Sequence, residues 1–213
     1  MDLFNALQLT KEEVVKDLYV LRSFALGVSE HLLLADLQAV ILQVPLRNMM
    51  TKMGFKMSAA MTNCGHLGWT SDRKGYRYTA HDPLTNQAWP SMPASFLQLA
   101  SSAATVCGFD NFVPDACLIN QYKVGSSMGL HQDKDELDFT QPIVSVSLGI
   151  PAVFAFGGSQ RIDKTIKIPL QHGDVVVWGN SARQHHHAIL SLKNSAHATL
   201  GAYRYNLTFR KAG

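Results

Sequence analysis

The sequence predicts an α+β protein that is mainly β, with a double-stranded β-helix (jelly-roll) core and helices on its N-terminal side. Two observations carry this prediction. From residue 114 onward, short β-rich runs follow one another with turn residues between them, which is typical of sandwiches and barrels. Before that point, apolar residues recur at helical spacing. A chain of 213 residues fits one domain, so we take 1–213 as a single unit.

Three segments ahead of the β-rich part have helical character: KEEVVKDLYVLRSF (11–24), SEHLLLADLQAVILQ (29–43) and PASFLQLASSAATVC (93–107). In the second, Ser29 is a candidate N-cap and Pro45 would end the helix. In the third, Pro93 stands at the start and Gly108 just past the end. We therefore expect helices that pack on the outside of a β core.

The predicted strands lie in ACLINQYKV (116–124), IVSVSLGI (143–150), AVFAFGG (152–158), KTIKIPL (164–170), DVVVWG (174–179), HHHAIL (185–190) and ATLGAYRYNLTF (198–209). Their spacing predicts an antiparallel arrangement. Residues 51–92, by contrast, are rich in Gly, Asn and aromatic residues, and we expect short strands and long loops there.

Composition narrows the class of protein. Hydrophobic residues make up 46% and charged residues 16%, which is typical of a globular protein rather than a disordered one. No apolar run approaches the roughly 20 residues that span a bilayer, and the first residues do not resemble a secretory signal. The three cysteines show no CxxC spacing. We therefore expect a cytoplasmic protein with free thiols that does not enter a membrane.

The charge distribution suggests a polyanionic partner. The net charge of +3 and the pI near 8.8 are only mildly basic. However, six basic residues stand between positions 47 and 78 against the single acid Asp72: Arg47, Lys52, Lys56, Arg73, Lys74 and Arg77. The acids gather elsewhere, notably at 133–138. A basic region apart from an acidic one favours a partner such as nucleic acid near the first.

The stretch GLHQDKDELD (129–138) contains a candidate metal site. His131 and Asp133 are two residues apart, so on an extended segment both side chains point the same way. A second histidine would complete a facial triad for iron. The run RQHHHAIL offers three, and we choose His187 because it directly precedes the apolar AIL. Alone, a His-x-Asp pair or an HHH run is more often a solvated turn than a ligand set.

The last predicted strand favours a dicarboxylate ligand beside this metal. In RYNLTFR, Arg204, Asn206 and Arg210 share one face with Thr208. An outer strand with its polar face in water would explain the pattern equally well. If this face points into the barrel instead, two guanidiniums are buried and need carboxylate partners. The run ACLINQY offers Asn120 and Tyr122 on one face for the same ligand. Iron with a 2-oxo acid and oxygen is the chemistry of a 2-oxoglutarate-dependent oxygenase.

Together these stretches resemble the AlkB family of alkylated-DNA repair dioxygenases. The resemblance covers nearly the whole chain and rests on MTNCGHLGWT, PDACLIN, LHQDKDE, PIVSVSLG, HGDVVVWG and RYNLTFR. It implies a jelly-roll core at about 114–210 and a nucleotide-recognition lid at about 45–92. It implies Fe(II) held by His131, Asp133 and His187.

The resemblance also assigns the cosubstrate and substrate contacts. It implies 2-oxoglutarate held by Asn120, Tyr122, Arg204, Asn206 and Arg210, with Arg204 at the distal carboxylate and Arg210 nearer the iron. Around a base flipped out of its strand it implies Trp69, Tyr76, Asp135, Thr51, Met57 and Arg161. Trp69 would stack on the base and Asp135 would read its exocyclic amine. Glu136 and Asp138 would then belong only to a solvated turn.

The activity implied is oxidative demethylation of N-alkylated bases, 1-methyladenine and 3-methylcytosine, in single-stranded DNA. Molecular oxygen and 2-oxoglutarate would be converted to succinate and carbon dioxide, and the methyl group would leave as formaldehyde. Double-stranded DNA and RNA stay open as further substrates, and a monomer is expected. Two alternatives remain: an oxygenase of the same cofactor class acting on a protein or a small molecule, and a non-catalytic β-sandwich that binds nucleic acid.

Overall fold

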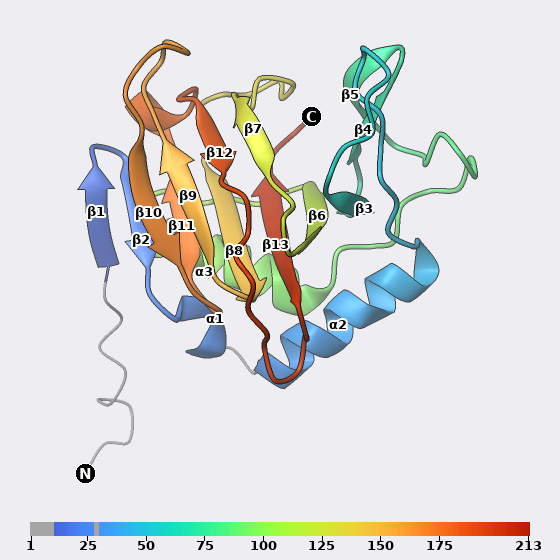
Figure 1. Cartoon of the computed structure of the whole chain (residues 1–213), viewed down its shortest axis with the longest axis horizontal. Coiled ribbons are helices and arrows are strands. Elements are labelled where there is room, and N and C mark those ends of the chain that lie inside the picture. The colour runs from blue at the N-terminus through green and yellow to red at the C-terminus, as the bar shows by residue number, and fades with distance from the viewer. Residues whose placement is uncertain (1–10, 28–29) are drawn as a thin grey trace.

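The computed structural model describes residues 11–27 and 30–213, and it contains two facing antiparallel sheets (Figure 1). The larger sheet has the strand order β1-β2-β11-β8-β13-β6-β3. Its strands are β1 (Lys11–Val15), β2 (Leu18–Leu21), β11 (Val175–Trp178), β8 (Ile143–Gly149), β13 (Tyr203–Arg210), β6 (Ala116–Lys123) and β3 (Ala60–Gly65). The smaller sheet has the order β10-β9-β12-β7. Its strands are β10 (Ile166–Leu170), β9 (Ala152–Phe156), β12 (His187–Ile189) and β7 (Met128–His131).

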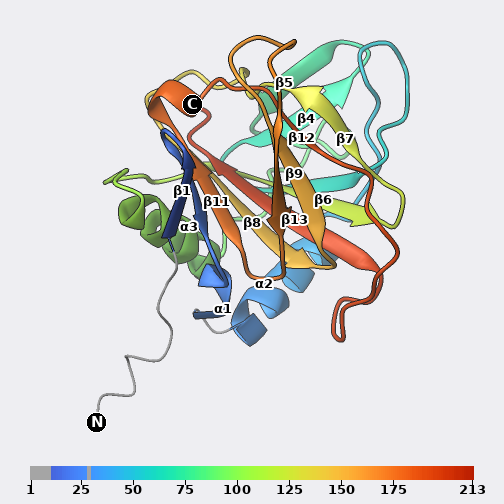
Figure 2. The ribbon, with the colours of Figure 1, turned by 60° about the vertical axis from the view of Figure 1, so that its left-hand side comes forward.

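Helices cover the outer face of the larger sheet (Figure 2). They are α1 (Phe24–Gly27), α2 (Glu30–Gln43) and α3 (Ala94–Val106), and a 3-10 helix follows at Asn180–Ala182. α2 and α3 match two of the predicted helices, and Gly108 takes a positive φ of 87° just beyond α3, where a side chain would be strained. The proposed cap Ser29 lies outside the described residues. Among the described residues no helix is long and apolar enough to cross a membrane.

The predicted helix at 11–24 is wrong. These residues form the β1–β2 hairpin, and β2 pairs with β11, more than 150 positions further along the chain. Lysine and glutamate favour a helix locally, but Asp17 turns the chain with a φ of 64° and the apolar Leu18 and Val20 are fully buried. Tertiary pairing therefore overrides local helix propensity in this segment.

The larger sheet has apolar residues on both faces because it contacts two cores. One face packs on α2 and α3 through residues such as Val144, Val146 and Phe209. The other face meets the smaller sheet, where Trp178 packs with Phe154 and Phe156. A strand buried on both faces reads as a nearly continuous apolar run, which is how PIVSVSLGI appears in the sequence.

The polar residues of β13 point into the space between the two sheets, as predicted. Arg204, Asn206, Thr208 and Arg210 are all buried, while Leu207 belongs to the core beneath the helices. Beside one end of the sheets stands a separate two-stranded hairpin, β4 (Gly68–Asp72) and β5 (Gly75–Thr79), at the upper right of Figure 1. The fold thus places a polar strand face and an aromatic hairpin around one space.

Candidate metal centre and cosubstrate site

Strand register brings the two predicted histidine ligands together. β7, a strand the sequence did not predict, pairs with β12 so that His131 and His187 stand directly opposite each other. Their ring centroids are 4.3 Å apart. Asp133 follows β7, and its two carboxylate oxygens lie 3.8 Å from the Nε2 atoms of His131 and His187, one oxygen each. One ligand atom from each residue can therefore converge on a single ion.

Backbone contacts fix the tautomer that a metal needs. His131 Nδ1 lies 2.9 Å from the carbonyl oxygen of Gly129, and His187 Nδ1 lies 3.1 Å from that of His185. A carbonyl oxygen only accepts, so each Nδ1 carries the proton and each Nε2 keeps its lone pair. The lone pairs face Asp133, which is the arrangement found in metal-ligating histidines.

Electrostatics keep His187 and Asp133 in ligand form at neutral pH. Burial, reinforced by the neighbouring His131, lowers the pKa of His187 to about 3, so its ring is neutral. Burial opposes ionisation of Asp133, but the Arg210 guanidinium holds its pKa below the ordinary range. Arg210 donates from Nε and Nη2 to Asp133 Oδ2 at 3.0 and 2.7 Å. Two neutral imidazoles and one carboxylate fit a divalent cation such as Fe(II).

Glu136 is not part of a solvated turn, and this expectation was wrong. Its carboxylate is buried, with only 5% of the residue exposed, and it accepts hydrogen bonds from Arg183 at 3.1 Å and Tyr78 at 2.7 Å. Arg210 Nε lies 3.4 Å away. Arg183 also donates to the carbonyl of Asp133. Glu136 therefore ties the metal-site loop to the β4–β5 hairpin. Asp138, in contrast, does hold a surface turn, by accepting from Thr140.

Arg204 has the properties of a residue that binds a small-molecule carboxylate. It is 1% exposed, and its Nη2 donates to Ser147 Oγ at 2.9 Å. Among residues 11–27 and 30–213, its buried Nε and Nη1 atoms have no hydrogen-bond partner. The guanidinium lies over the ring of Tyr122, 5.2 Å from the centroid. A buried cation with unpaired donors is costly, so these atoms fit the carboxylate of a bound dicarboxylic acid.

The other predicted cosubstrate residues stand on the same strands. Asn120 Oδ1 is buried and has no partner in the described part of the chain, and because amide orientation is an assignment the group can equally present its donors. The Tyr122 hydroxyl makes a weak contact with Met128 Sδ at 3.7 Å, and burial raises its pKa to about 12. Asn206 is already held by Ser145 and Thr208. Asn120 and Tyr122 thus have more bonding capacity left than Asn206.

A cavity of about 630 Å³ opens over the triad and is lined by every predicted site residue except Arg204. Arg204 lies deeper, behind Tyr122. On the hairpin side, Trp69 and Tyr76 stack with centroids 5.5 Å apart and planes at 18°. Trp69 Nε1 donates to Asp135 Oδ2 at 2.9 Å. An aromatic pair and a carboxylate therefore stand together at the cavity wall.

The remaining predicted contacts surround the cavity mouth. Thr51 accepts a hydrogen bond from the backbone N–H of Phe55 and so shapes a tight turn. Met57 is partly buried against the inter-sheet core. Arg161 is exposed and donates to the carbonyl of Leu130 at 2.8 Å. His186, whose role the sequence left open, also lines the cavity, whereas the ring of His185 packs near Phe156.

A second group of two histidines and one carboxylate lies near the start of α2. His172 Nε2 is 3.1 Å from Glu30 Oε1, and the ring of His197 is 4.2 Å from that of His172. Here, however, backbone N–H groups face the Nδ1 atoms: Gly149 donates to His172, and Thr199 and Leu200 donate to His197. Each neutral ring must then carry its proton on Nε2, where a metal would bind. The group is a clamp between loops rather than a metal site.

A jelly-roll core with two histidines and one carboxylate, next to a buried arginine lacking a carboxylate, defines an Fe(II)- and 2-oxoglutarate-dependent oxygenase. Sequence comparison agrees: residues 17–210 match the profile of the 2OG-Fe(II) oxygenase superfamily. The chain belongs to this superfamily and, within it, to the AlkB family. It therefore uses Fe(II), 2-oxoglutarate and molecular oxygen.

Individual relatives support the same assignment. The chain is 51% identical to the alpha-ketoglutarate-dependent dioxygenase AlkB of Escherichia coli (strain K12), over 100% of this chain and 98% of that protein. It is 32% identical to the nucleic acid dioxygenase ALKBH1 of Mus musculus, over 58% of this chain and 29% of that protein. The solved structure of OsALKBH1 superimposes with a TM-score of 0.79 at 26% identity, covering 95% of this chain and all of that one.

Proposed function

We propose that this dioxygenase demethylates N-alkylated bases, 1-methyladenine and 3-methylcytosine, in nucleic acid, with single-stranded DNA as its main substrate. Double-stranded DNA and RNA are secondary candidates. The names of its relatives, which include a nucleic acid dioxygenase and AlkB, support a nucleic-acid substrate. The observation that carries the proposal is the wall of the cavity, where an aromatic pair and a carboxylate stand beside the metal ligands.

That wall suits a flipped, cationic base. The Trp69–Tyr76 pair offers a flat aromatic surface, and base–aromatic stacking contributes about 1–3 kcal/mol per base. Asp135 Oδ2 already accepts from Trp69, which orients the carboxylate and leaves Oδ1 to accept from an exocyclic amine. The negative charge favours a base that methylation has made positive. Methylation of the pairing edge also weakens the base pair, so extrusion costs less for damaged bases.

The residues around the metal divide the remaining tasks. His131, Asp133 and His187 would hold Fe(II), and Arg204, Arg210, Asn120 and Tyr122 would bind and orient 2-oxoglutarate, with Asn206 supporting them. When bound, the iron and cosubstrate supply the oxidation of the N-methyl C–H bond, with the products succinate, carbon dioxide and, after the hydroxymethyl group leaves, formaldehyde. The protein's own contribution is to place the methyl group beside the metal and to exclude water.

The proposal includes the arrangement of the chain. Residues 45–92 would act as the nucleotide-recognition lid of a single domain whose catalytic core spans 114–210. Thr51, Met57, Tyr76 and Arg161 would contact the strand at the cavity mouth. The three free, buried cysteines are consistent with a reducing, cytoplasmic setting, and we take the protein to act as a monomer.

The test compares substrates in one assay. Protein supplied with Fe(II), 2-oxoglutarate and oxygen is given an oligonucleotide containing 1-methyladenine or, separately, a peptide containing methylated lysine. Formaldehyde should form from the oligonucleotide and only when all three components are present. Formaldehyde from the peptide but not from the oligonucleotide would contradict the proposal and favour an oxygenase of a different substrate class.

A matched pair of variants tests the aromatic wall. Trp69→Ala should raise KM for the oligonucleotide by about fivefold to about 150-fold, since it removes stacking worth about 1–3 kcal/mol. Trp69→Phe keeps an aromatic face and should recover most of that loss. Equal KM values for the two variants would mean that Trp69 does not stack on the substrate.

A further inference from the structure

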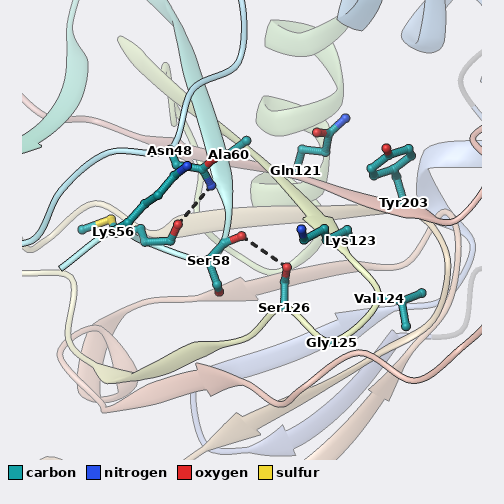
Figure 3. Close-up of a pocket in the computed structure, with 11 residues that line it drawn as sticks. Asn48, Lys56, Ser58, Ala60, Gln121, Lys123, Val124, Gly125, Ser126 and Tyr203 are labelled. Carbon is teal, nitrogen blue, oxygen red and sulfur yellow. Dashed lines mark hydrogen bonds between the residues drawn. The ribbon is translucent and has the colours of Figure 1, made fainter.

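Beside the cavity lies an open groove of about 640 Å³. Figure 3 shows the residues that line it. Its walls come from the lid at Asn48 and Lys56, from the end of β6 at Lys123 and from the first residue of β13, Tyr203. Met57 and Ser58 line both spaces, so the groove begins where the cavity ends. A strand leaving the cavity over these two residues would enter the groove.

Hydrogen bonds make the rim between the two spaces rigid. Ser58 Oγ donates to the carbonyl of Ser127 at 2.6 Å. Ser126 Oγ donates to the carbonyl of Ser58 at 3.2 Å, as Figure 3 shows. The turn that carries Ser126 is also fixed by Gly125, whose N–H donates to the carbonyl oxygen of Leu192. The groove therefore has a fixed shape, joined to the core rather than formed by one loose loop.

The groove is cationic because its lysines have no acidic partners. In the basic region, Arg47 is paired with Asp82 and Arg77 with Asp72. Within residues 11–27 and 30–213, no ion pair joins Lys56 or Lys123 to a carboxylate, and none of the residues lining the groove is acidic. Both lysines are exposed, on opposite walls. Two unpaired ammonium groups facing one channel favour a polyanion.

We propose that this groove binds the phosphodiester backbone of the substrate strand on one side of the flipped nucleotide. The inference rests on the proposed function, since it assumes that a nucleic acid strand occupies the cavity. Lys56 and Lys123 neutralise successive phosphates, and the exposed ring of Tyr203 stands at the far end, where a base can stack on it. The groove adjoins the cavity at Met57 and Ser58, so a strand reaches it in only one of its two directions.

An acidic peptide is the competing occupant, and the geometry disfavours it. The groove shares Met57 and Ser58 with the cavity that holds the metal ligands, so a strand held in the cavity is near enough to extend into the groove. A strand of evenly spaced phosphates meets both lysines wherever it lies along the channel. A peptide would need acidic side chains at matching spacing.

The experiment measures how strand length affects turnover. Three substrates carry the same methylated base: a trinucleotide with the base at its centre, and the same trinucleotide extended by several residues at its 5′ or its 3′ end only. For the unaltered protein, one of the two extensions should raise kcat/KM. The double variant Lys56→Gln/Lys123→Gln should lose the gain from that extension, by about fourfold per lysine at physiological salt.

A matched control removes the same charge elsewhere. Lys16→Gln/Lys167→Gln takes two exposed lysines from the β1–β2 turn and from β10, at the other end of the sheets (Figure 1). This variant should keep the gain from the favoured extension. Equal loss in both double variants would mean long-range attraction rather than a groove, and an unchanged gain in Lys56→Gln/Lys123→Gln would overturn the inference directly.

Turnover of the trinucleotide by the unaltered protein reports the proposed function alone. If this turnover is absent, the proposed function fails. Binding of an unmodified single strand to the groove can still be measured by fluorescence anisotropy. The dependence of log K on log salt should then be shallower by about 0.7 for each lysine removed from the groove than for the control variant. Identical slopes for the two double variants overturn the groove.

Discussion

Residues 11–27 and 30–213 contain two groups of two histidines and one carboxylate, and the backbone decides their different roles. At His131, Asp133 and His187, carbonyl oxygens face Nδ1 and leave the Nε2 lone pairs for a cation. At Glu30, His172 and His197, amide N–H groups face Nδ1, so Nε2 carries the proton and acts as a donor. Residue types and proximity alone do not identify a metal site, because the tautomer must also permit ligation.

The largest expected difference between the groups is in metal binding. Asp133→Ala should weaken metal binding and lower turnover by more than about 100-fold. Mutating a residue that only hydrogen-bonds a ligand costs up to about 100-fold, and removing a ligand itself should cost more. Glu30→Ala should leave both unchanged. Titration with Co(II), followed by its visible absorption, measures binding in each variant. A Co(II) signal that survives in Asp133→Ala and vanishes in Glu30→Ala would reverse the assignment of the two groups.

The two sites should also differ in how much a nearby glutamate stabilises the fold: Glu136 beside the metal centre, and Glu30 within the second group. Glu136→Ala leaves Arg183 buried without its carboxylate partner, while Arg210 keeps Asp133, so the free energy of unfolding should fall by about 3–5 kcal/mol. Glu30 has a side chain that is 41% exposed, and Glu30→Ala should cost less than about 1 kcal/mol. Urea denaturation of the metal-free protein measures both. Similar losses would show that the Glu136 network is not as tightly buried as its contacts indicate.

The pH dependence of stability should distinguish the histidines. The pKa of His187 is lowered to about 3 by burial, so without metal the unfolded chain binds a proton that the folded chain does not. Stability is then complete above pH 6.5 and falls as pH drops toward 3. His187→Gln should remove much of this fall. His197→Gln should remove less, because that ring is less buried and its pKa is lowered more weakly. Denaturation of chelator-treated protein between these pH values provides the measurement.

The smallest effect tests the acceptor role of His172. His172→Ala leaves the buried N–H of Gly149 unpaired and should cost about 1–3 kcal/mol. In His172→Asn the amide oxygen can take the place of Nδ1, so the loss should be about 1 kcal/mol smaller. Thermal unfolding of the two variants checks the order. If His172→Asn is no more stable than His172→Ala, then Nδ1 of His172 does not accept from Gly149, and that contact does not fix the tautomer of the ring.

The sequence alone predicted the polar face of β13 and the helices α2 and α3 because their patterns are local. Alternation in RYNLTFR and helical spacing in 30–43 need no distant partner to be interpreted. The triad residues could also be proposed, since His-x-Asp and a later histidine match a known ligand set. The sequence favours His187 over His185 only because His187 precedes the apolar AIL, and it does not reveal the register between β7 and β12 that places His187 opposite His131.

Features that depend on contacts between distant parts of the chain could not be predicted from the sequence. Residues 11–24 form strands because β2 pairs with β11, and Glu136 is buried because Arg183, 47 positions later, covers it. Locally, both segments are highly charged and suggest exposed structure. The two histidine groups show the same limit, because the atom facing each Nδ1 belongs to backbone geometry that composition does not reveal.

The pairing of β7 with β12 makes the metal centre unusually sensitive to insertions and deletions. Side chains alternate between faces, so adding or removing a single amino acid in either strand would turn one imidazole away from the ion while leaving every ligand present in the chain. Length changes in the turns beyond these strands carry no such penalty. Natural variation in chain length near this enzyme's iron should therefore be confined to the loops.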